Sequence, residues 1–196
     1  EIYHQILGSS APPAPIPGGR RMEGALMTVS SLRTESTPAP TSNPLDVMEE
    51  LVSANEWRYD RSNEEEMIVE IAGQWCEYRM FFVWQADLGA MYFSSLFDLK
   101  VPAQKKKETA ELLSLINERL WLGHFDLCSE EAAPMFRHTI LLRGTSGVTV
   151  EQLEDLMEAA LCECERYYPA FQFVIWGGKR PEEAMQAAML ETVGEA

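Results

Sequence analysis

The feature that most constrains the fold is the stretch that begins at Met67, where apolar residues alternate and then run together at strand length. From Met67 to Ala72 apolar and other residues alternate, as in a strand with one buried face. Gly73-Gln74 offers a two-residue hairpin turn, which would pair Ala72 with Trp75. In this register the apolar side chains of both strands share one face. The pattern therefore predicts an antiparallel hairpin.

The next strands carry more apolar surface than one buried face requires. The 23 residues that end at Phe97 include eight aromatic side chains, and beyond Arg79 both faces of the strand are apolar. Antiparallel sheets usually leave one face in water. Either helices cover both sides of the sheet, or a second subunit covers one side. Phe81, Val83 and Tyr92 are therefore candidate contacts for a partner or a dimer.

Helix signals surround these strands. Asn43-Pro44 suits the start of a helix. Pro102 precedes an apolar stripe that extends to about Leu122, and Thr149 begins a third helix with a capping box. Pro169 is expected to kink that helix, and a last short helix follows. A second hairpin, between about residues 124 and 143, separates the second and third helices. Strands grouped in hairpins predict an α+β fold with an antiparallel sheet of about five strands.

The chain divides into two segments of different composition. Residues 1–42 are rich in proline and glycine, and they are expected to form a disordered tail. Since the chain does not begin with Met, an untrimmed upstream extension is an alternative, and a partner-binding arm is another. Residues 43–196 are predicted to form the folded domain. Residues 44–196 contain 28 acidic and 13 basic side chains, and they account for the net charge of −15.

This acidity limits the classes of partner. An acidic surface repels phosphate backbones, so nucleic acid is not expected as a partner. No apolar run reaches the length of a membrane span, and we expect no secretory signal before the domain. The four cysteines have no framework spacing, and we expect reduced thiols in the cytoplasm. No motif for a cofactor or a metal occurs.

Two constellations are candidates for a catalytic or a metal site. A symmetric second hairpin would place His138 opposite Asp126, which could support base catalysis. A surface charge pair is the alternative that we favour, because no motif places a nucleophile beside it. Cys162 and Cys164 lie two residues apart in a predicted helix and point in different directions, so they cannot share one ion. We expect one of them to be buried and the other exposed.

Two surface features remain as candidate contacts. Met185 and Met189 lie on one side of the last helix, where adaptable methionines could face a partner. The alternative is that they belong to the core. Lys105-Lys106-Lys107 is either a solvated helix start or a docking site for an acidic partner.

The C-terminal region resembles a known family. The run from Tyr167 to Lys179, with Pro181-Glu182-Glu183-Ala184 after it, is similar to the C-terminal signature of the YbjN-like family, described as bacterial sensory transduction regulators. The resemblance covers about residues 43 to 196. It implies a small, acidic and commonly dimeric protein whose fold is similar to that of type III secretion chaperones. The family has no assigned catalytic residues, so the resemblance implies none in this chain.

These observations predict a non-enzymatic protein-interaction module, chaperone-like or regulatory, that acts as a homodimer with an unidentified protein partner. The alternative is a small-molecule sensor or an enzyme. Such a protein would use a pocket between the sheet and the helices, near Trp84, Trp121 and Trp176.

Overall fold

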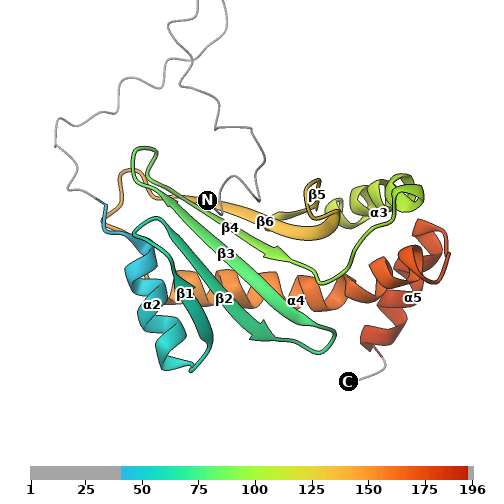
Figure 1. Ribbon diagram of the computed structural model, residues 1–196, viewed down its shortest axis with the longest axis horizontal. Helices are drawn as coiled ribbons and strands as arrows, with labels where there is room; N and C mark the ends of the chain where they lie inside the picture. The colour runs from blue at the N-terminus through green and yellow to red at the C-terminus, as the bar shows by residue number, and fades with distance from the viewer. Residues whose placement is uncertain (1–40, 194–196) are drawn as a thin grey trace, which may run out of the picture.

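The computed structural model describes residues 41–193, which form an α+β domain with one antiparallel sheet (Figure 1). The helices are α2 (Pro44–Ala54), α3 (Lys106–Asn117), α4 (Val150–Ile175) and α5 (Pro181–Val193), and the short helix η2 (Ala103–Lys105) precedes α3. The strands are β1 (Arg58–Arg61), β2 (Glu66–Ala72), β3 (Glu77–Gln85), β4 (Ala90–Leu96), β5 (His124–Cys128) and β6 (Ala133–Leu141). The predicted fold class is confirmed, with six strands in the order β1-β2-β3-β4-β6-β5.

Two helices begin where the sequence predicts. The Asn43 side chain accepts a hydrogen bond from the Leu45 backbone N–H, and Pro44 occupies the first turn of α2. The Thr149 hydroxyl accepts from the Gln152 backbone N–H, and the Gln152 side chain accepts from the Thr149 backbone, which completes the capping box of α4. These caps satisfy backbone donors that have no partner inside the helix.

The register of the first hairpin differs from the prediction by two residues. Ala72 pairs with Glu77 rather than with Trp75, so residues 73–76 form a four-residue loop. The longer loop lets Trp75 stack on Tyr168 of α4, with ring centroids 6.4 Å apart. The Gln74 backbone N–H also donates to the Glu165 side chain. A shift of two residues keeps each side chain on its predicted face, so the assignment of the buried face was correct.

One helix boundary also differs from the prediction. Helix α3 ends at Asn117, short of the predicted end near Leu122, and the Asn117 side chain binds the backbone of Phe125 on the next strand. Helix α4 continues through Pro169 for 26 residues without a break. Pro169 is buried, and the aromatic residues beside it, Tyr168 and Phe171, pack in the core. Packing on the sheet outweighs the lost helical hydrogen bond.

The main hydrophobic core lies between the sheet and the helices. It contains the alternate strand residues Met67, Val69, Tyr78, Met80 and Phe82 together with the buried faces of the helices. In Figure 1 the strands lie in front of α4, so the view looks onto the opposite face of the sheet. Within residues 41–193 no helix covers that opposite face, which we call the helix-free face.

Candidate interaction surface

The strand register arranges the helix-free face in rows that cross the sheet. In one row Val83 lies beside Tyr92, and Tyr92 lies beside Thr139. The next row runs from Ile68 through Phe81, Ser94 and Arg137 to His124. In the third row Glu70 lies beside Arg79, followed by Leu96, Met135 and Asp126. Because cross-strand partners point to the same side, each row is a set of neighbouring side chains.

A second layer of buried apolar side chains lies on this face. It is separate from the main core cluster, although its members are less than 9% exposed. The layer consists of Phe81, Val83, Ala90, Cys128, Ala133 and Met135. Phe81 and Val83 are 7% and 4% exposed. The predicted apolar character of the second sheet face is therefore present in the structure, and no described helix packs on it.

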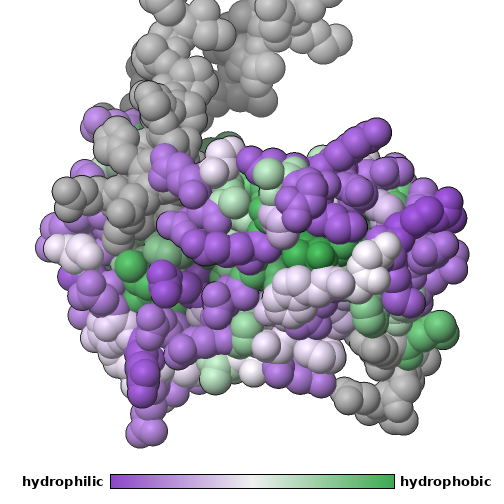
Figure 2. Space-filling view, turned by 45° about the vertical axis from the view of Figure 1, so that its right-hand side comes forward, coloured by the Kyte–Doolittle hydropathy of each residue, from purple (hydrophilic) through white to green (hydrophobic). Residues whose placement is uncertain are grey.

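A hollow of about 360 Å³ opens on the same face. Its apolar lining includes Ile68, Phe81, Leu96 and Met135, and charged residues from four different elements and loops surround them. A second hollow of about 300 Å³ adjoins it near β1 and shares Ile68, Glu70 and Arg79 with it. In Figure 2 hydrophobic surface in the middle of the molecule lies between hydrophilic ridges.

Tyr92 and Arg137 form the polar part of this face. The Arg137 guanidinium lies over the Tyr92 ring, 5.3 Å from its centroid, and donates to the Asp126 carboxylate at 2.6 Å. Burial raises the pKa of the Tyr92 hydroxyl, and the nearby Arg137 charge offsets part of that effect. The arrangement fixes the orientation of two long side chains next to the apolar layer.

The candidate contact residues are divided between two places. Phe81, Val83 and Tyr92 share the helix-free face, as the alternation predicts. Met185 is 3% exposed and belongs to the main core, and Met189 is partly buried against that core. The two methionines therefore lie on α5, which packs against α3 and α4 and not on the helix-free face.

The predicted His138–Asp126 pair does not form. Asp126 lies opposite Met135, and Arg137 is its ion-pair partner. His138 lies opposite Phe93, on the face that packs against the helices. The error is a shift of three residues in the second hairpin, and an odd shift moves every side chain to the other face. Burial and the proximity of His124 lower the pKa of His138.

The three tryptophans named for the alternative pocket lie in different surroundings. Trp84 is 5% exposed in the core, whereas Trp121 and Trp176 are 82% and 65% exposed. None of the three lines either hollow described above. The cysteine prediction is confirmed, since Cys162 is exposed and Cys164 is buried. Burial raises the pKa of the Cys164 thiol, so Cys164 stays in its neutral form.

The hollow itself was missed at the sequence level, although its signal was present. Ile68, Phe81 and Leu96 alternate with core residues along three neighbouring strands. Glu66 begins β2 and is 6% exposed. The correct register would have placed Ile68 and Phe81 together, next to the Glu70–Arg79 pair.

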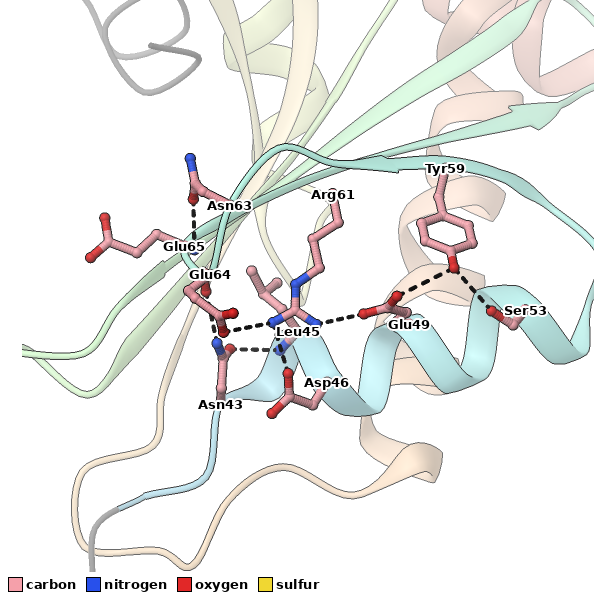
Figure 3. Close-up of polar contacts among 10 residues, drawn as sticks. All are labelled: Asn43, Leu45, Asp46, Glu49, Ser53, Tyr59, Arg61, Asn63, Glu64 and Glu65. Atoms are coloured by element: carbon pink, nitrogen blue, oxygen red, sulfur yellow. Dashed lines mark hydrogen bonds and ion pairs between the residues drawn. The ribbon is translucent and has the colours of Figure 1, made fainter.

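An ion-pair cluster joins the edge strand β1 to α2 (Figure 3). The Arg61 guanidinium on β1 contacts Asp46 at 2.7 Å and Glu49 at 2.6 Å, both on α2, and Glu64 at 3.3 Å. The Tyr59 hydroxyl lies between Glu49 and Ser53 of α2 in Figure 3. These contacts hold α2 against the edge strand β1, on the side away from the helix-free face.

Two further findings concern residues 41–193. His, Cys, Asp and Glu side chains form no group of three or more there that could hold a metal ion. No helix in that range is long and apolar enough to cross a membrane. Of the predicted disordered tail, Thr41 and Ser42 are described, and Ser42 bonds to the backbone of Ser146. The rest of that prediction lies outside the described residues.

Comparison with known proteins confirms the family resemblance. The crystal structure of YbjN from E. coli is similar with a TM-score of 0.44 and 12% identity, covering 65% of this chain and 88% of that one. The ExsC–ExsE complex gives a TM-score of 0.42 and 11% identity, covering 62% of this chain and 88% of that chain. No curated protein matches the chain. The model of the YbjN family, described as "Putative bacterial sensory transduction regulator", matches residues 44–173. The chain therefore belongs to the YbjN family.

Proposed function

We propose that this protein is a non-enzymatic protein-interaction module, chaperone-like or regulatory, and that it binds its partners on the helix-free face. The observation that carries the proposal is the second apolar layer, a set of buried side chains on a sheet face that no described helix covers. Sheets that pack against nothing usually present polar residues to water. The regulatory description of the family agrees with such a role.

A homodimer is part of the proposal. The end of the helix-free face near Val83 and Tyr92 also carries Leu141, which is 76% exposed and lies beside Ala90 in the sheet. A second copy placed there would cover an exposed leucine and extend the apolar layer across the interface. The four cysteines are all free thiols, which is consistent with a bacterial cytoplasm as the compartment.

The chain offers a matched pair of variants for testing the dimer. Leu141 on β6 and Leu190 on α5 are 76% and 75% exposed, but Leu141 alone lies on the helix-free face. We expect Leu141→Glu to weaken the dimer about tenfold or more, because a charge would be buried at the interface. Leu190→Glu should leave it unchanged. Sedimentation velocity at micromolar concentration measures both, and a wild-type monomer would contradict the homodimer.

The partner-binding claim is tested separately. Affinity purification from the bacterium that encodes the protein should recover a specific protein with the wild type and with Leu190→Glu. Ile68→Asp, on the helix-free face, should lose that protein, while circular dichroism checks that the variant is folded. If no specific protein is recovered, or if the same protein is retained by Ile68→Asp, the helix-free face is not the binding surface.

A further inference from the structure

We infer that the hollow on the helix-free face binds a short segment of a partner protein in which apolar residues are flanked by lysine or arginine. This inference rests on the proposed function and specifies the chemistry of the partner. The hollow lies across β2, β3, β4 and β6, and it continues toward β1 as the adjoining hollow. At about 360 Å³ it is at the small end of ligand sites, which suits a few side chains and not a large cofactor.

The apolar part of the hollow comes from Ile68, Phe81, Leu96 and Met135. Ile68 and Leu96 are partly exposed, and Phe81 and Met135 form the buried layer below them. An apolar side chain inserted there would be removed from water on several sides at once. Such pockets hold the few residues that supply most of the binding energy of an interface.

The charges around the hollow determine which partner residues are favoured next to the inserted apolar side chain. Four carboxylates line it, from Glu70, Glu77, Asp98 and Glu131, against two cations, Arg79 and Lys100. Arg79 lies directly opposite Glu70 in the β2–β3 register, and setting these two charges against each other leaves Glu77, Asp98 and Glu131 against Lys100. The lining is therefore net negative, in a protein with a net charge of −15. Electrostatic complementarity favours a basic segment and disfavours an acidic one.

The position of the hollow leaves it accessible beside a dimer. The hollow uses the Ile68–Phe81 row and the rows beyond it, whereas Leu141 and Thr139 lie at the other end of β6. A second copy seated on Leu141 and a peptide seated on Ile68 therefore occupy different rows of the same face. Both can bind at the same time.

A labelled model peptide tests the inference. The probe is a fluorescein-labelled hexapeptide with two central leucines between pairs of lysines, titrated against the full chain and followed by fluorescence anisotropy. Replacing the leucines by serines should weaken binding about tenfold or more, since the anchor is lost. Replacing the lysines by glutamates should abolish it.

Variants of the protein separate the hollow from general attraction to an acidic surface. Glu77 and Glu131 are exposed, so the double variant Glu77→Gln, Glu131→Gln should fold and should weaken binding about threefold to fivefold. The matched control is Glu154→Gln with Glu158→Gln, which removes the same charge from exposed positions on α4. The control should bind the probe as the wild type does. Equal weakening by both double variants would overturn the inference, because any acidic protein would then suffice.

A competition experiment distinguishes the source of the bound segment. An unlabelled synthetic peptide of residues 1–40 should not displace the probe if the occupant belongs to another protein. Displacement at similar concentration would overturn the inference and would make the chain's own N-terminal region the occupant. If the probe fails to bind while Ile68→Asp still loses a partner, the peptide chemistry is wrong and the proposed function stands. If substitutions on the helix-free face change neither the peptide titration nor the affinity purification, both the inference and the proposed function are wrong.

Discussion

The side-chain amide of Asn117 makes two hydrogen bonds to the backbone of Phe125. Its Oδ1 accepts from the Phe125 N–H at 2.7 Å, and its Nδ2 donates to the Phe125 carbonyl at 2.9 Å. Phe125 lies on β5, which is an edge of the sheet. The last residue of α3 thus takes the place that a neighbouring strand would have, and it protects an edge that could otherwise pair with another chain.

Asn117→Ala should destabilise the domain by about 1–3 kcal/mol, because it leaves a backbone donor and acceptor of a partly buried strand without partners. Urea unfolding followed by circular dichroism measures the change. Ser114→Ala is the control, since Ser114 is exposed on the same helix and should cost little. A cost below about 0.5 kcal/mol for Asn117→Ala would show that water replaces the amide at this edge.

Gly123→Ala should cost about 3 kcal/mol, for two physical reasons. Gly123 has φ +64°, a region that alanine adopts at a cost of about 1–2 kcal/mol. An added Cβ would also overlap the buried Phe136 ring and lie 2.8 Å from the Arg137 carbonyl oxygen.

Gly178 separates the two effects. Its φ is +65°, and nothing lies within 4 Å of an added Cβ, so Gly178→Ala should cost about 1 kcal/mol. Thermal or urea unfolding of both variants gives the difference, which is the part due to the contacts with Phe136 and the Arg137 carbonyl. Equal costs would mean that the ring moves aside freely.

Arg61→Met should destabilise the domain by about 1 kcal/mol. The Arg61 side chain is 16% exposed and balances three carboxylates, which would repel each other after its removal. The acids are more exposed than the arginine, so solvent screens part of the effect. Urea unfolding in low salt measures the loss. Arg58→Met, on the exposed side of the same strand, is the control, and a larger loss for Arg58→Met would contradict the role of the cluster.

The wild type should lose stability relative to His138→Gln as the pH falls from about 7.5 to about 5.5. Burial lowers the pKa of His138 in the folded state below its ordinary value of 6.5. The unfolded chain therefore binds the proton more readily, and the contribution of neutral His138 is complete above pH 6.5 and declines below it. Urea unfolding of both proteins across this range gives the difference curve. A difference curve that is flat or rises toward acid would contradict the burial of the imidazole.

Local signals predicted much of the fold because they act over a few residues. The Asn43 cap, the Thr149–Gln152 capping box and the alternation of Met67, Val69 and Ile71 each depend on neighbours in the chain. Those elements occur where the sequence places them. The partition of the aromatic strands into two apolar faces was also correct, because a period of two decides it.

The errors arose where distant residues decide the local structure. The loop at residues 73–76 has its length because Trp75 packs on Tyr168, almost a hundred residues later in the chain. Pro169 stays helical because its neighbours pack in the core. The second hairpin was misaligned by an odd number of residues, which created a false His138–Asp126 pair and hid the Arg137–Asp126 pair.

The strand order also determines how this chain can reach its native state. Four of the five strand pairings join strands that are consecutive in the chain, and each can form as a local hairpin. The pairing of β4 with β6 joins residues about 40 to 50 positions apart, with α3 and β5 between them. Closing that loop costs conformational entropy before the stabilising contacts between β4 and β6 have formed. Assembly of two preformed sheet fragments at the β4–β6 seam is therefore the step expected to limit the folding rate.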